Sequence, residues 1–186
     1  MVVILTTYKS PRAPVIWTAR YPILQVPALS DYSYWQAFNL LWDQDVIIVN
    51  IEHDIFPTKS QIDTLLKCQH EFCAWCYNCP DDSLIENGKL VDKQATGLQL
   101  QAWEGGRPVE YGSEHADVAG IGFCKLGVKR GLELSPVPWY LVDSQVNLAV
   151  KAKGGWHLHW PLIGHRPIGP KFTAPDGNME WAELPK

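Results

Sequence analysis

The sequence predicts a single α/β domain over residues 1–186, built on a mixed, mostly parallel sheet with helices on its faces. The main observation is a continuous apolar run, Val46–Ile51, which has the length and composition of a strand buried on both faces. Three other stretches repeat apolar residues at helical spacing, at 31–42, 60–68 and 138–150. A chain of 186 residues is long enough to bury a substantial core as one domain.

The composition narrows the functional class. A net charge of −4 and the lack of a Lys/Arg block argue against a nucleic-acid-binding surface. No apolar stretch approaches the roughly 20 residues that cross a bilayer, and Met1–Leu5 lacks a basic leader, so we expect a cytoplasmic protein. Five cysteines, an odd number, do not fit a secreted disulfide framework. Among nine tryptophans, we expect some in the core and others lining a sugar- or ring-binding groove.

The first predicted element is a strand at the N-terminus, followed by a polar loop at 7–14. Ligands of open α/β sheets bind beyond the carboxyl ends of strands, where hydroxyls and an arginine can hold a diphosphate or a base. A solvated loop explains the same residues equally well. The candidate ligand-binding residues are Thr6, Thr7, Tyr8 and Arg12.

Residues 15–30 carry prolines without periodicity, so we expect irregular structure there. Asp31 is suited to cap a helix. The apolar residues that follow share one face of that helix: Trp35, Phe38, Leu41 and Trp42.

The central strand ends abruptly in three polar residues, Glu52, His53 and Asp54. Glu52 and Asp54 are two residues apart, so they face the same way if the extended conformation persists. Two carboxylates on one face suit a hard divalent cation that also binds a phosphate-bearing substrate. Alternatively, Asp54 and Pro57 only end the strand and begin a turn.

A capping-box variant at 60–63 predicts a helix that ends near Cys68, with Ile62, Leu65 and Leu66 buried. The aromatic stretch at 72–77 predicts another strand.

The cysteines around that strand resemble part of a ferredoxin motif, but Asp82 stands where the fourth cysteine would be. A zinc site usually has two separated ligand pairs, and here only Cys124 is left. A strand also sends Cys73 and Cys76 to opposite faces. We therefore expect buried free thiols and no zinc or iron at the cluster, which comprises Cys68, Cys73, Cys76 and Cys79.

Beyond the cysteines, the pattern predicts a loop at 80–96, a strand at 97–103 and an acidic, glycine-containing loop at 104–118. A strand flanked by glycines follows at 120–127. These glycines permit close backbone approach by a ligand, or simply accommodate turns.

The next helix begins near Pro138, a good first helical residue, and Gly154 and Gly155 should stop it. Asp143 falls in its first or second turn, where the helix dipole favours a carboxylate. Its buried stripe should consist of Val142, Val146, Ala149 and Val150.

A histidine-rich segment follows at 156–161. On a strand, His157 and His159 share one face, and His165 lies close behind in the sequence. A single histidine is usually structural, but three histidines within nine residues indicate a metal ligand as readily as a structural role. Residues 166–186 carry four prolines and are expected to form a surface tail.

Taken in order, these motifs resemble those of GT-A-fold glycosyltransferases of the family-2 type over roughly residues 1–165. Glu52-His-Asp-Ile-x-Pro57 looks like the family's Asp-x-Asp-type metal motif, with Glu in place of the first Asp. Gly120-x-Gly-Phe123 is similar to its acceptor segment, and Trp139-x-x-x-Asp143 to the start of the helix with the catalytic carboxylate. The histidine segment is similar to its closing metal ligand.

The resemblance implies a UDP- or GDP-linked sugar donor, a bridging Mn²⁺ or Mg²⁺, and inverting transfer to an acceptor hydroxyl. It implies that Asp54, assisted by Glu52, and one of His159 or His165 hold the metal, with His53 near the donor. Asp143 would be the general base. Only about 50 residues precede the metal motif, which implies an abbreviated nucleotide-binding half.

Two alternatives remain open from the sequence. One is a metal-dependent hydrolase that uses Glu52, Asp54, His157 and His159. The other is a non-catalytic carbohydrate-binding protein on a degenerate transferase fold.

Overall fold

The computed structural model describes residues 1–8, 21–27, 31–52, 55, 57–80, 85–86, 89–90, 98–128, 142–163, 170–173 and 179–181. Within these ranges, no helix is long and apolar enough to cross a membrane.

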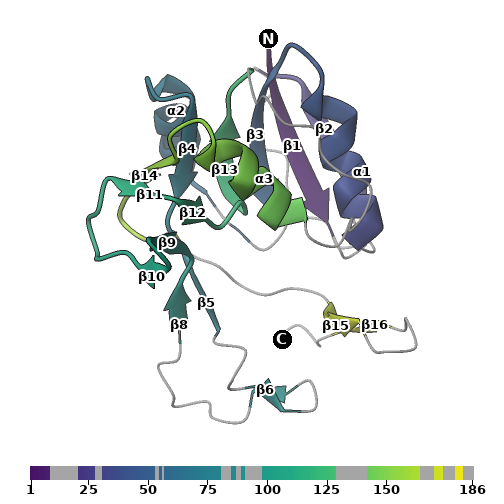
Figure 1. The fold of residues 1–186 in the computed structure, drawn as a ribbon. Coiled ribbons are helices and arrows are strands. Elements are labelled where there is room, and N and C mark those ends of the chain that lie inside the picture. Colours follow the sequence, from purple (N-terminus) through teal and green to yellow (C-terminus); the bar gives the residue numbers. More distant parts are fainter. Residues whose placement is uncertain are drawn as a thin grey trace.

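A seven-stranded mixed sheet forms the centre of the fold, in the order β11-β14-β4-β13-β3-β1-β2 (Figure 1). β2, β1 and β3 are parallel, and β13 is antiparallel to both β3 and β4. β4 therefore runs with β3, as does β14, whereas β11 runs against β14. The expected mixed, mostly parallel sheet is confirmed. Its strands are β1 Val2–Tyr8, β2 Ile23–Pro27, β3 Ile47–Glu52, β4 Phe72–Trp75, β11 His115–Ala116, β13 Phe123–Leu126 and β14 Trp156–His159.

Three helices cover the sheet, α1 Asp31–Trp42, α2 Lys59–Lys67 and α3 Val142–Lys151. α1 and α3 pack on one face of the sheet, where Phe38 and Val146 join a core that includes Ile48 and Trp156. α2 packs on the other face, and the core there includes Ile62, Leu65, Val49, Ile51 and Trp75. Figure 1 shows α3 lying across the sheet at β13, with α1 beside β1 and β2. Both apolar stripes predicted for α1 and α3 are buried.

The start of α2 differs from the prediction. Thr58 is the N-cap: its hydroxyl accepts the Gln61 N–H at 3.2 Å, and the Gln61 side chain accepts the Thr58 N–H at 2.7 Å. This reciprocal pair is a capping box, and it lies two residues before the predicted one at Ser60. The predicted end is confirmed, because Cys68 is the C-cap.

Several short strands occur where the sequence predicted loops or one longer strand. β2 lies within the stretch expected to be irregular; it is an edge strand, where Pro22 and Pro27 are tolerated. The strand predicted at 97–103 is broken at Gln101 into two. A strand of two or three residues is too short to show the alternation of apolar and polar residues by which strands are predicted. The remaining strands are β5 Asn78–Pro80, β6 Ile85–Glu86, β7 Lys89–Leu90, β8 Leu98–Leu100, β9 Ala102–Glu104, β10 Arg107–Pro108, β12 Val118–Ala119, β15 Pro170–Thr173 and β16 Met179–Trp181.

The end of α3 is tied to β11 by a histidine. Gly154 and Gly155 adopt positive φ values of 106° and 86°, which end the helix as predicted. His115 Nε2 lies 2.8 Å from the Gly154 carbonyl oxygen, and its Nδ1 lies 3.0 Å from Glu104 Oε1. The hydrogen bond to the Gly154 carbonyl is the main cause of a raised pKa of His115; burial opposes it, and the Glu104 carboxylate raises the pKa further.

We expect this contact to make stability depend on pH. Because the folded-state pKa of His115 is raised, its contribution is fully present below the unfolded-state value of about 6.5 and is lost as pH rises through the folded pKa. His115→Gln keeps a donor for the Gly154 carbonyl but does not titrate. The free energy of unfolding, measured by urea titration, should therefore differ between His115→Gln and wild type more at pH 5.5 than at pH 8.5. A difference that is the same at both pH values would contradict this.

Candidate functional site

The carboxyl end of β3 carries a buried polar network. The Tyr34 hydroxyl of α1 donates a hydrogen bond to Glu52 Oε1. Asn50 is fully buried and lies on the same face of β3 as Glu52. Its Nδ2 donates to the Ile121 carbonyl oxygen at 2.7 Å. Asn50 Oδ1 is buried without a hydrogen-bond partner among the described residues. Buried polar atoms are nearly always paired, so Asn50 Oδ1 stands out as an unused acceptor within this network.

The glycines at 120 and 122 allow side chains to approach the backbone beside Glu52. The Gly122 N–H donates to the Tyr77 hydroxyl at 3.1 Å, and its carbonyl accepts the Glu52 N–H at 2.8 Å. A Cβ at Gly122 would lie 3.0 Å from both Glu52 Oε2 and Tyr77 Oη. The close approach that the glycines permit is therefore that of Glu52 and Tyr77.

Gly120→Ala should destabilise the protein. The added Cβ would lie 2.3 Å from Tyr77 Oη and 2.6 Å from Tyr77 Cζ, and the buried ring has little room to move. Overpacking of this kind typically costs about 1–3 kcal/mol in the free energy of unfolding, which urea denaturation would measure. Gly127→Ala is a matched control, because its Cβ would meet the exposed, flexible side chain of Glu71. Equal losses in the two variants would show that the rigidity of the Tyr77 ring is not the cause.

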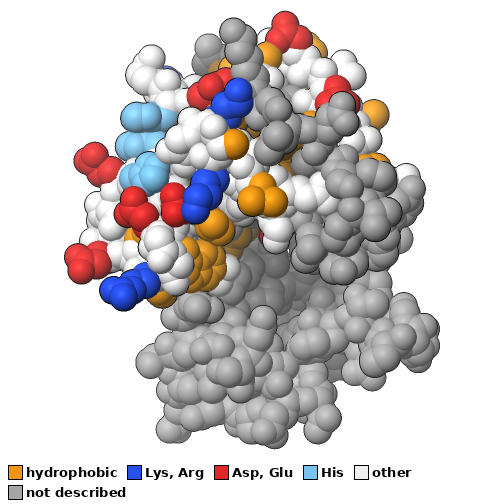
Figure 2. All heavy atoms as spheres, viewed as in Figure 1, with side chains coloured by type: hydrophobic (Ala, Val, Ile, Leu, Met, Phe, Trp, Pro, Cys, Tyr) orange, Lys and Arg blue, Asp and Glu red, His pale blue; other side chains and the backbone are white. Residues whose placement is uncertain are grey.

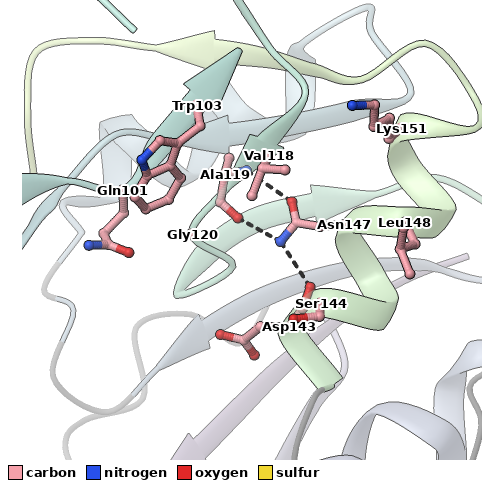
Figure 3. Close-up of a pocket in the computed structure, with 10 residues that line it drawn as sticks. All are labelled: Gln101, Trp103, Val118, Ala119, Gly120, Asp143, Ser144, Asn147, Leu148 and Lys151. Atoms are coloured by element: carbon pink, nitrogen blue, oxygen red, sulfur yellow. Dashed lines mark hydrogen bonds between the residues drawn. The ribbon is translucent and has the colours of Figure 1, made fainter. Parts of the chain in front are cut away.

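An open pocket of about 380 Å³ lies between α3 and the small sheet formed by β10, β9 and β12 (Figure 3). One face of α3 contributes Asp143, Asn147 and Lys151. The half-buried indole of Trp103 lies across from them, on β9. The full lining is Gln101, Trp103, Val118, Ala119, Gly120, Asp143, Ser144, Asn147, Leu148 and Lys151.

Asn147 fixes α3 against this small sheet. Its Nδ2 donates to the Ala119 and Asp143 carbonyl oxygens at 3.0 and 2.8 Å. Its Oδ1 accepts the Ala119 N–H at 2.9 Å and the Trp156 indole N–H at 2.7 Å. Because these bonds hold the first turn of α3, the exposed Asp143 side chain that lines the pocket stands on a well-anchored helix (Figure 3).

Glu52 and Asp143 act electrostatically on the same groups. Burial raises the pKa of Tyr34 well above its ordinary value, and the charges of Glu52 and then Asp143 raise it further. The same order of causes, burial and then Glu52 and Asp143, raises the pKa of the Cys124 thiol. Glu52 accepts the Tyr34 hydroxyl of α1, and Asp143 belongs to α3, so both carboxylates lie on the side of the sheet that α1 and α3 cover.

The histidine segment lies on the other side of the sheet. As predicted, His157 and His159 share one face of β14, while Trp156 and Leu158 are buried. They stand opposite Cys73 and Trp75 of β4, which belong to the α2 side. The His159 ring stacks on Trp75, with centroids 5.3 Å apart. Figure 2 shows histidine side chains gathered over the region of α2, β11 and β14.

Burial lowers the pKa of His159 to about 4, and the nearby His157, Lys125 and His70 lower it as well. His159 is therefore neutral at physiological pH and offers a lone pair. The structure does not bring it to Glu52, so a single metal site that joins these two residues is not formed. The same placement separates Glu52 from His157, which the hydrolase alternative would need beside it.

The predicted residues of β1 lie next to Glu52. Thr7 is the cross-strand neighbour of Glu52, and Thr6 and Tyr8 flank it at the carboxyl end of β1. The other predicted site residues lie outside the described residues: Arg12, His53, Asp54 and His165.

Sequence reasoning missed Tyr34, Asn50 and Gln101 as site residues. Asn50 sits within the apolar run of β3 and Tyr34 beside the apolar residues of α1, and nothing local marks either residue as part of a polar network. The high tryptophan content was the one available signal for Trp103. Unlike Trp156, which is fully buried, Trp103 lines the pocket.

No family model matches the chain, and no curated protein matches it. The crystal structure of A197 from STIV is similar to this chain, at 11% sequence identity and a TM-score of 0.46. The similarity covers 100% of this chain and 99% of that one.

Proposed function

We propose that this protein is a metal-dependent glycosyltransferase that moves a sugar from a UDP- or GDP-linked donor to an acceptor hydroxyl. One observation carries the proposal. Glu52, at the carboxyl end of a central strand, and Asp143, at the start of α3, lie on the same side of the sheet, and Asp143 lines a pocket together with Trp103. Ligands of open α/β sheets bind in the crevice beyond the carboxyl ends of the strands, which is where Glu52 lies.

The donor side of the site is the carboxyl ends of β1 and β3. Glu52 supplies a carboxylate there, oriented by the Tyr34 hydroxyl, and Asp54 follows two residues later in the sequence. Oxygen ligands of this kind fit Mn²⁺ or Mg²⁺, so Glu52 and Asp54 would hold the metal, with His165 as the candidate third ligand. The bound ion would neutralise charge on the diphosphate leaving group. Thr6, Thr7, Tyr8, Arg12 and His53 are the further donor-binding candidates.

The acceptor side is the pocket beside α3. An indole face such as that of Trp103 presents a large, rigid apolar surface, on which the ring of a sugar can stack. A volume of about 380 Å³ falls within the range of small-molecule sites. Asp143 would accept the proton of the acceptor hydroxyl as that oxygen attacks the sugar. The helix N-terminus favours the ionised carboxylate, which is the form that can take a proton.

The proposal is tested by nucleotide-induced thermal stabilisation. UDP or GDP should raise the melting temperature of the purified chain in Mn²⁺, and not in a metal chelator, because the ion links the diphosphate to the carboxylates. The absence of stabilisation by either nucleotide in the presence of Mn²⁺ or Mg²⁺ would contradict it. Stabilisation by oligosaccharides alone would favour a non-catalytic carbohydrate-binding protein instead.

A further inference from the structure

A cluster of soft metal ligands lies apart from the proposed transferase site, on the α2 side of the sheet. Cys68 directly follows α2, Cys73 lies in β4, and His159 lies in β14, which pairs with β4. The two sulfur atoms and a ring nitrogen of His159 all lie within 4.8 Å of one another. Three separate elements supply these groups, so the tertiary fold brings them together.

We propose that Cys68, Cys73 and His159 bind a zinc ion, distinct from the Mn²⁺ or Mg²⁺ of the donor site. Thiolate and imidazole ligands suit zinc, whereas Mg²⁺ and Mn²⁺ prefer oxygen. Three protein ligands leave the fourth tetrahedral position for a water, on the side where Cys68 is partly exposed.

Two buried groups support a zinc–thiolate site here, and the first is the ring of His159. Its Nε2 atom is buried and has no hydrogen-bond partner among the described residues. A metal bound to that nitrogen would remove the cost of leaving it unpaired.

The second group is Lys125, which is only 6% exposed and lies opposite Cys73 on β13. Its Nζ donates to the Cys68 carbonyl oxygen at 2.6 Å, and no described carboxylate pairs with it. A buried ammonium normally needs a counter-charge. Two zinc-bound thiolates would supply it, and Lys125 would in turn offset their negative charge.

The sulfur atoms must separate for the ion to enter. The Sγ atoms of Cys68 and Cys73 are 2.7 Å apart, whereas two thiolates at about 2.3 Å from a tetrahedral zinc are about 3.8 Å apart. Cys73 is held in β4, but Cys68 is a partly exposed C-cap residue, so a side-chain rotation there can open the pair.

This proposal departs from the expectation of no zinc at the cysteine cluster. That expectation rested on the absence of a second ligand pair and on the opposite directions of Cys73 and Cys76. The directions are confirmed, since Cys73 belongs to the α2-side core and Cys76 to the opposite core. The additional ligand, however, comes from a distant strand that sequence spacing does not connect to the cysteines.

The test is a titration of the full, reduced and metal-free chain with Co²⁺ and then Zn²⁺. We expect about one equivalent of Co²⁺ to bind with a thiolate-to-cobalt charge-transfer band and tetrahedral d–d bands, and Zn²⁺ to displace it. Cys68→Ser and His159→Gln should each weaken Zn²⁺ binding by at least about a hundredfold. Cys68 is partly exposed, so Cys68→Ser should remain folded, which far-ultraviolet circular dichroism would verify.

Two control variants test whether zinc binding is specific to these three ligands. Cys76→Ala removes a thiol from the same segment but from the opposite face, and should leave zinc binding unchanged. Asp54→Ala should also leave it unchanged, so failure of the transferase proposal would not affect this test. Failure of the folded, reduced chain to bind Co²⁺ or Zn²⁺ would overturn the proposal. Binding that lacks the thiolate band, or survives both ligand variants, would overturn it too.

Discussion

Asp143→Asn should reduce sugar transfer by at least about a hundredfold while donor affinity stays near the wild-type value. Asparagine keeps the size of the side chain but cannot accept the proton of the acceptor hydroxyl. The proposed metal and diphosphate contacts lie at the ends of β1 and β3, so they should survive. Initial transfer rates and nucleotide affinities, measured on the same protein, would give both quantities.

The alternative role for Asp143 is stabilisation of α3 through the helix dipole. The variant would then lose on the order of 1 kcal/mol of stability and no specific activity. Asp63→Asn is a matched control, since Asp63 pairs with the exposed Lys59 on α2, away from the pocket. Full transfer activity in Asp143→Asn would mean that the base lies elsewhere or that the mechanism is retaining.

Asp54→Ala should abolish Mn²⁺-dependent nucleotide binding and leave the fold intact. The variant removes one of the two carboxylates proposed to hold the ion, and the remaining Glu52 already accepts the Tyr34 hydroxyl. Isothermal titration with UDP or GDP in Mn²⁺ would measure the loss. The melting temperature without ligand would show that the fold is preserved.

Asp45→Ala provides the comparison for this variant. Asp45 is an exposed carboxylate just before β3, at the opposite end of the strand from Glu52. Its removal changes the net charge equally but should not alter nucleotide binding. Unchanged Mn²⁺-dependent affinity in Asp54→Ala would remove Asp54 from the metal site.

Elements with long, consistent patterns could be predicted from the sequence. The continuous apolar run predicted a strand buried on both faces, and the apolar stripe at helical spacing predicted the buried face of α3. Both elements, β3 and α3, are present. The alternation that places His157 and His159 on one face of β14 is local as well. In each case the burial pattern repeats along a single element, so neighbouring residues are sufficient to detect it.

Features that depend on partners far away in the chain could not be predicted. The pocket beside Asp143 lies where α3 meets β9 and β12, and Asn147 joins α3 to β12 through its bonds to Ala119, a pairing that no local pattern records. The side of the sheet occupied by His159 depends on its pairing with β4, which sequence spacing does not reveal. The two proposed ion sites therefore lie on opposite sides of the sheet, although the resemblance to glycosyltransferases implied that His159 or His165 binds the metal together with the carboxylates.

Sugar transfer itself is the most direct test of the proposed function. The purified chain would be incubated with UDP- and GDP-linked sugars, Mn²⁺ and a panel of glycan acceptors, and products would be detected by mass spectrometry. The proposal predicts an acceptor that gains the mass of one sugar, with release of the nucleoside diphosphate, in wild type and far less in Asp143→Asn. Equal product from wild type and Asp143→Asn, or no product from any donor to which the chain binds in Mn²⁺, would contradict it.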